Sequence, residues 1–252
     1  MRITQATSTL NWRYAIGEIF LIAVGVLIAL ALGSWNTERQ NQALSEEYLN
    51  RLIRDIQADI AVADQTLIRL ENKSRGLEIL ANASTDRSAS MVDPQGLYKV
   101  LADTLSLAFN APSIRRSTFD DMMSTGRLSL IASIDLRDRI LEYYALGTNS
   151  ESRLEGRMTA YPQHVFENVP PEVLSAYDIT PDSFPESETE TTPGPSEFPP
   201  EVVESILSWA SDPETQRVVN AERNYSSHAI QIVGAVRNRA QRLISKIESA
   251  NR

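Results

Sequence analysis

The chain has 252 residues, of which 42% are hydrophobic and 23% are charged, and its formal net charge is −9. It contains no cysteine, so disulfides and thiolate metal sites are excluded. The two histidines, His164 and His228, are too few for a histidine-rich metal centre. The negative charge argues against binding to nucleic acid. We therefore expect no cofactor, no bound metal and no nucleic-acid partner.

A membrane span is the clearest feature near the N-terminus. Residues 14–35 read YAIGEIFLIAVGVLIALALGSW, which is 22 residues with one charge, Glu18. About 20 apolar residues match the hydrocarbon core of a bilayer at about 1.5 Å per helical residue. Trp12 and Tyr14 stand at one end and Trp35 at the other, as expected of interfacial aromatic anchors. The sequence therefore predicts a transmembrane helix that contacts the lipid bilayer.

A cleaved signal peptide is the competing interpretation of this segment. Arg2 and Arg13 would form its basic region, and Ala29-Leu30-Ala31 resembles a cleavage site. The apolar run is long for a signal peptide, however, and a polar helical pattern follows it without a break. These two features favour the anchor.

The charges beside the span predict its orientation. Residues 1–13 carry Arg2, Arg13 and the α-amino group but no acid, and a short tail before a long translocated domain is the simpler arrangement. We expect a single-pass protein of the bacterial inner membrane. Residues 1–13 would be cytoplasmic and the bulk of the chain periplasmic.

Small residues form one face of the predicted span. Gly25, Ala29 and Gly33 recur every four residues, a spacing that lets another helix approach closely. At about 100° per residue, Glu18 lies about 20° from Gly25 and from Ala29. Because a carboxylate in lipid is costly, we expect this face to contact another transmembrane helix, from a second copy or a partner subunit. Alternatively, Glu18 reaches up to the headgroups.

Amphipathic helices are predicted after the span, in a bundle that begins at residue 36 and whose first part ends at residue 158. A stripe at three- and four-residue steps runs from 37 to about 83, and charged residues, Asp59 among them, fill the other faces. The stripe comprises Leu49, Leu52, Ile56, Ile60, Ala63, Leu67, Leu70, Leu77 and Leu80. No Pro or Gly interrupts it before Gly76, so the membrane helix is expected to continue into it.

Shorter helices are predicted from their start signals. Asp93 is expected to cap a helix that begins at Pro94 and ends near Phe109. Ser117 or Thr118 would cap a second, which Gly126 ends. Asp135 would cap a third, with an apolar face of Leu136, Ile140, Leu141, Tyr144, Leu154 and Met158.

The region 159–212 has a different composition. It contains most of a stretch with twelve acids and no Lys or Arg, and its densest part, 180–200, holds six prolines. We interpret the region as an acidic, Pro-rich loop that buries too little apolar surface to form helices. The alternative is a docking segment for a basic partner or divalent cations.

A second long helix is predicted from Pro213 to the end of the chain, residues 213–252. Its stripe comprises Val218, Tyr225, Ala229, Ile232, Val236, Leu243 and Ile247, and basic residues crowd its last turns. If it folds back along the helix over 37–83, both stripes are buried. The fold class is therefore all-α, a single transmembrane helix continuing into an elongated antiparallel bundle.

Catalytic motifs are absent from the sequence, and we expect the protein not to be an enzyme. Neighbouring serines do not make His228 part of a triad, and His164 lies beside Pro162 in the predicted loop. Asp120 and Asp121 are typical of a helix start rather than of a metal site.

Two segments resemble a family of uncharacterised bacterial single-span membrane proteins. RYAIGEIFLIAVGVLIALALGSWNTER is similar to their anchor, YAIGEIxLIxxGxLIAL followed by WN. STFDDMMSTGRLSLIASIDLRDRILEYY is similar to a second signature, TFDxxxSxGxLxLI followed by LR and YY. The resemblance covers about a fifth of the chain and implies a helical extracytoplasmic domain behind one anchor, with no activity to carry over. The ALALGSWN end is more apolar than the family pattern.

Two functions follow as expectations. The first is a membrane-anchored periplasmic scaffold or accessory subunit that acts through protein–protein contacts, as a homo-oligomer or in a larger inner-membrane complex such as a respiratory or photosynthetic one. The second is a periplasmic sensor or ligand-binding bundle that signals through a partner.

Overall fold

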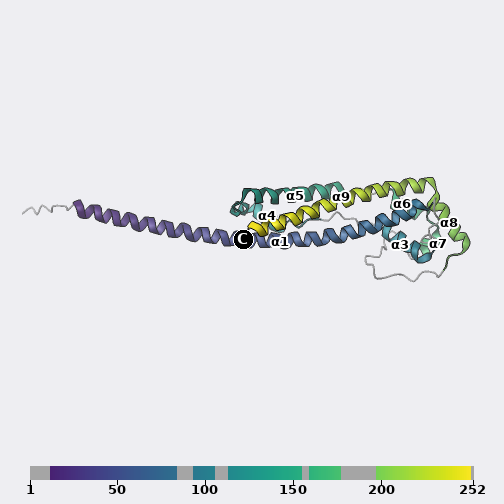
Figure 1. The fold of residues 1–252 in the computed structure, drawn as a ribbon, viewed down its shortest axis with the longest axis horizontal. Coiled ribbons are helices and arrows are strands. Elements are labelled where there is room, and N and C mark those ends of the chain that lie inside the picture. Colours follow the sequence, from purple (N-terminus) through teal and green to yellow (C-terminus); the bar gives the residue numbers. More distant parts are fainter. Residues whose placement is uncertain (1–11, 84–92, 106–112, 155–158, 177–196, 251–252) are drawn as a thin grey trace, which may run out of the picture.

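One very long helix organises the whole molecule. The computed structural model describes residues 12–83, 93–105, 113–154, 159–176 and 197–250, and every regular element among them is a helix. Helix α1 (Trp12–Asn82) has 71 residues without a break, which is roughly 105 Å at about 1.5 Å per residue. Helix α9 (Pro213–Ala250) folds back beside its C-terminal half (Figure 1). The predicted all-α fold, with the apolar segment continuing into an antiparallel bundle, is confirmed.

The two predicted stripes hold α1 and α9 together. On α1 the buried positions include Leu52, Ile56, Leu77 and Leu80, all fully buried. The facing positions on α9 are apolar at the same three- and four-residue steps, and these are Val218, Ala229, Ile232, Val236, Leu243 and Ile247. Burying both stripes removes apolar area from water along the full length of the contact.

Shorter helices widen the bundle at its two ends. Near the apolar segment, α4 (Ser117–Ser124), the 3₁₀ helix η1 (Arg127–Leu130) and α5 (Ile134–Leu154) cover α1 and α9. We call the core that they enclose the proximal core: Tyr48, Leu49, Leu52, Ile56, Ile114, Phe119, Met122, Ile131, Leu136, Ile140, Tyr143, Tyr144, Val236, Ala240, Leu243 and Ile247. At the other end, α3 (Pro94–Leu105), α6 (Tyr161–Asn168), α7 (Pro171–Ala176) and α8 (Pro200–Ser211) enclose a second core. We call it the distal core: Leu77, Leu80, Ala83, Leu97, Val100, Leu101, Leu105, Tyr161, Val165, Val169, Val173, Val202, Ile206, Leu207, Trp209, Ala210, Val218 and Val219.

The prediction of a continuous loop over 159–212 is wrong. Three helices lie in it, α6, α7 and α8, while residues 177–196 fall outside the described part of the chain. The reason is periodicity: the region places apolar residues at helical steps, and these are buried in the distal core. They are Tyr161, Val165, Val169, Val173, Val202, Ile206, Leu207, Trp209 and Ala210. The acids occupy the remaining faces, so average composition concealed an amphipathic pattern.

Two helix starts differ from the prediction and one agrees. The carboxylate of Asp93 accepts the Gly96 N–H at 2.7 Å, which confirms the predicted cap of α3. For α5 the acceptor is Ser133, whose Oγ lies 3.2 Å from the Leu136 nitrogen, whereas Asp135 is in the first turn. No side chain of the described residues caps α4; instead the Thr118 hydroxyl donates to Asp55 at 2.6 Å.

The end of α4 is as predicted, whereas one residue of the predicted apolar face of α5 is exposed. Gly126 ends α4 with a positive φ of 69°, as glycine at a helix end permits. Leu141, predicted on the buried face of α5, is 38% exposed. Phe109 and Met158 lie outside the described residues.

The prediction that Asp59 lies on a solvated face is wrong, because Asp59 is only 5% exposed. Its Oδ1 accepts the backbone N–H of Arg115 at 3.0 Å, and its Oδ2 accepts the Tyr143 hydroxyl at 2.8 Å. Burial raises the pKa of Asp59 above its ordinary value, against the lowering effect of these two hydrogen bonds. The carboxylate therefore joins three separate parts of the chain inside the bundle.

Replacing Asp59 should test this junction. Asp59→Ala is expected to lower the free energy of unfolding by about 2–4 kcal/mol, because the buried Tyr143 hydroxyl and the backbone N–H of Arg115 lose their acceptor. Asp59→Asn keeps an oxygen acceptor and should cost less than half as much. Thermal unfolding of the full chain in detergent micelles, followed by circular dichroism, measures both.

The stability of the wild type relative to Asp59→Asn should change with pH in one direction. A raised pKa means that folded Asp59 binds its proton more tightly than the unfolded chain does. Wild-type stability relative to Asp59→Asn is therefore greatest below about pH 3.9, the unfolded pKa, and falls as the pH rises through the folded pKa. A constant difference from about pH 3 to about pH 8 would contradict the assignment.

Candidate functional site

The N-terminal part of α1 exposes apolar side chains on every side. Phe20 and Leu21 are 69% and 74% exposed, and the large apolar residues between Ile16 and Trp35 are all exposed. The helix includes a segment of mean hydropathy 2.5, none of it buried within the chain. This segment is long and apolar enough to cross a bilayer. A surface of this size in contact with water would be strongly unfavourable.

The aromatic ends of the segment match the thickness of a bilayer. Trp12 and Trp35 are 71% and 63% exposed, and a separation of 23 positions corresponds to roughly 35 Å along the helix. The hydrocarbon core is about 30 Å thick, so both indoles would stand near its edges. Tyr14 lies in α1, but its side chain is outside the described part.

Polar groups near the Trp35 end are satisfied within the helix itself. The Ser34 hydroxyl donates to the Leu30 carbonyl at 2.7 Å, and the Thr37 hydroxyl donates to the Gly33 carbonyl at 3.0 Å. Such bonds remove the cost of bringing hydroxyls into an apolar surrounding. Glu18 has no ion-pair partner among the described residues and is exposed.

The four predicted contact residues share one uninterrupted helix. A Cβ added at Gly25 or at Gly33 would meet no atom within 4 Å, and Ala29 is exposed between them. With Glu18 they lie within about 80° of arc on the helix surface at about 100° per residue. Among the described residues, therefore, no second element packs on this face.

A bare helical neck separates this segment from the bundle. Residues 36–43 of α1 are almost entirely exposed, and packing begins with Leu44 and Ser45, just before Tyr48. This neck extends roughly 12 Å at about 1.5 Å per residue. Because the helix does not break there, the bundle stands at a fixed distance from the apolar segment (Figure 1).

A polar and aromatic junction fastens α1 to α4 and η1 at the base of the bundle. The Tyr48 hydroxyl donates to Asp121 at 2.7 Å and accepts a hydrogen bond from Arg127. Phe119 and Tyr144 stack with ring centroids 4.0 Å apart. Phe119, Tyr143 and Tyr144 therefore belong to the proximal core, and for Tyr144 this confirms the predicted position on an apolar helix face.

This junction was not predicted from the sequence. The sequence predicts only a helix-start role for Asp121, and it gives no signal for Tyr48 because the partners of Tyr48 are more than 70 positions away. No cluster of three potential metal-binding side chains occurs among the described residues. The nearest signal in the sequence is the TFDD motif itself, which combines a ring with adjacent acids.

The two histidines lie on helices. His164, predicted in a loop, is in α6, where its Nε2 is 2.8 Å from the Thr215 hydroxyl of α9. His228 is partly buried on α9. Two positions before it, Ser226 is buried and its hydroxyl has no hydrogen-bond partner among the described residues.

Comparison of the chain with protein-family models, curated proteins and solved structures finds no match. The resemblance to single-span bacterial membrane proteins therefore stays a prediction.

Charges placed in the apolar segment should prevent its insertion. The pair Leu27→Arg and Leu30→Arg is expected to cost about 5–7 kcal/mol of insertion free energy, since each arginine near mid-bilayer costs about 2.5–3.5 kcal/mol. The fraction of protein that resists carbonate extraction from bacterial membranes should fall sharply. The matched pair Val62→Arg and Ile68→Arg, on exposed positions of the same helix within the bundle, should leave it unchanged. Equal behaviour of the two pairs would contradict the assignment of the span.

Proposed function

We propose that the protein is a membrane-anchored accessory subunit or scaffold of the bacterial inner membrane. Residues 1–13 would lie in the cytoplasm, and the bundle would act in the periplasm through protein–protein contacts, including those of a larger respiratory or photosynthetic complex. The observation that carries the proposal is the unbroken passage of α1 from its exposed apolar segment into the bundle. A rigid connection of this kind suits a part that sets position and distance.

The interior of the bundle supports a structural role. Two of its buried charged groups pair with each other: Lys73 and Glu222 form an ion pair of 2.5 Å between α1 and α9, with side chains 10% and 3% exposed. Thr159 also donates to Glu222. A buried pair of this kind is costly to break, and it specifies which residues of two helices face each other.

The open face of the span is where the proposed partner helix would pack. At about 100° per residue, Leu52 and Ile56 lie about 160° and 200° around the helix from Glu18. These two residues mark the side of α1 that the bundle covers. The side that carries Glu18, Gly25 and Ala29 is therefore turned away from the bundle, and a second transmembrane helix can reach it without a clash.

A bulky residue on the small-residue face should disrupt complexes. Ala29→Leu is expected to reduce the share of protein that migrates in a complex by roughly tenfold after gentle detergent extraction, which corresponds to about 1.4 kcal/mol. Ala31→Leu makes the same chemical change about 160° away on the helix and should have no effect. Native electrophoresis and identification of the co-migrating proteins provide the measurement.

The outcomes separate the candidate functions. A stoichiometric complex that Ala29→Leu weakens and Ala31→Leu does not supports the accessory subunit. A lone species that carries a bound small molecule would contradict it and favour the sensor or ligand-binding bundle.

A further inference from the structure

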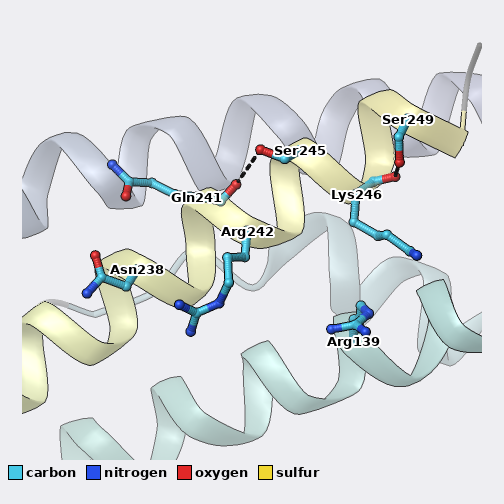
Figure 2. Close-up of a pocket in the computed structure, with 7 residues that line it drawn as sticks. All are labelled: Arg139, Asn238, Gln241, Arg242, Ser245, Lys246 and Ser249. Atoms are coloured by element: carbon cyan, nitrogen blue, oxygen red, sulfur yellow. Dashed lines mark hydrogen bonds between the residues drawn. The ribbon is translucent and has the colours of Figure 1, made fainter.

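A basic groove lies between α5 and the C-terminal part of α9. It is shallow and open to solvent, has a volume of about 500 Å³, and is lined by Arg139 of α5 and by six residues of α9, which are Asn238, Gln241, Arg242, Ser245, Lys246 and Ser249 (Figure 2). No apolar residue and no acid is among them. An apolar ligand would therefore leave these polar groups without partners.

The charges in the groove are only partly neutralised. Asp135, which stands beside the groove, is 3.1 Å from Arg139 Nε and 3.0 Å from Lys246 Nζ, so one carboxylate serves two cations. Hydrogen bonds from Lys246 and Arg139 lower the pKa of Asp135, which keeps it ionised.

Arg242 is the exception among the arginines of this part of α9. Arg237 and Arg239 each pair with a carboxylate, Asp64 and Glu142 respectively. Arg242 has no carboxylate partner within the described residues, and in Figure 2 its guanidinium extends from α9 toward α5. Three cations and one shared carboxylate leave the groove with an excess of about two positive charges.

The height of the groove argues against lipid headgroups as its occupant. Since α9 runs antiparallel to α1 and Arg237 pairs with Asp64, Arg242 lies near the level of residue 59. That level is roughly 35 Å above Trp35 at about 1.5 Å per residue. The headgroup layer adds only about 5–8 Å, and the Debye length is about 8 Å in physiological salt. The bilayer that holds the span is therefore out of reach of an upright bundle.

The shape and lining of the groove fit a stretch of polypeptide. From Asn238 to Ser249 the α9 wall extends roughly 16 Å, which equals about five residues of extended chain at about 3.3 Å each. Amide and hydroxyl side chains along it both donate and accept hydrogen bonds, as a peptide backbone requires. The guanidinium groups suit carboxylates, which they can bind in a bidentate manner.

We propose that this groove binds an extended acidic segment of a partner protein through Arg242, Arg139 and Lys246. The proposal rests on the proposed function, because it names the chemistry of the partner surface that the scaffold would hold. Unlike the contact in the membrane, this one would be sensitive to salt, since it is made between exposed charges.

The test uses the full chain in a non-ionic detergent and a fluorescein-labelled hexaglutamate peptide as the probe, read by fluorescence anisotropy. Wild-type protein should bind the peptide saturably and lose it on addition of salt. Arg242→Glu should weaken binding at least tenfold. Arg223→Glu makes the same charge change on α9 about 28 Å away and should change binding less than twofold.

Three results would overturn the proposal. One is the absence of saturable binding, and another is an equal loss in the two variants, which would reflect net charge alone. The third is tight binding of phosphatidylglycerol vesicles that depends on Arg242 and displaces the peptide, which would identify a membrane surface. Peptide binding is measured on the isolated protein, so an absence of binding contradicts only the groove assignment. The lack of any native complex contradicts the proposed function.

Discussion

The continuity of α1 is the constraint on which the rest of the structure depends. In a bilayer every backbone N–H and C=O must find its partner within the segment, and a helix is the way for a single span to do so. The same ladder of hydrogen bonds continues past Trp35, through the neck, into the bundle. The rotation and height of the bundle are thereby coupled to the span. Within the bundle α1 packs against α9, α3, α4 and η1, whereas in the apolar segment its large apolar side chains are exposed.

Side-chain chemistry differs between the two ends of the bundle. The proximal core combines aromatic stacking with a set of hydrogen bonds that link α1 to α4, η1 and α5, through Tyr48, Asp55 and Asp59. The distal core is mostly aliphatic and is closed by short helices on α1 and α9. The middle of the bundle is thinner, with few core residues, and there the Lys73–Glu222 pair aligns the two long helices. A long, narrow bundle held in this way is suited to span a distance rather than to enclose a ligand.

Much of this architecture could be predicted from periodicity, and the exceptions have physical reasons. The stripes of α1 and α9 persist over many turns, so Leu52 and Leu243 were correctly expected to be buried. Asp59 was misassigned because its charge argued for solvent, and its partners Arg115 and Tyr143 come from distant parts of the chain. Helices α6 to α8 were missed because their acids and prolines outweighed a few valines spaced at four residues. The apolar segment, its aromatic ends and its small residues could be read directly from the sequence. The basic groove could not, because Arg242 and Lys246 suit a helix end equally well, and only the fold brings Arg139 beside them.

The distance between the span and the bundle tests the central claim most directly. Because the chain contains no cysteine, the pair Leu27→Cys and Gln65→Cys can carry two spin labels on α1 in reconstituted membranes. An unbroken helix places these positions roughly 57 Å apart at about 1.5 Å per residue, and pulsed electron paramagnetic resonance should give a single narrow distribution near that value. A broad distribution centred well below it would mean that the chain bends at the neck, and the rigid connection between membrane and bundle would be refuted.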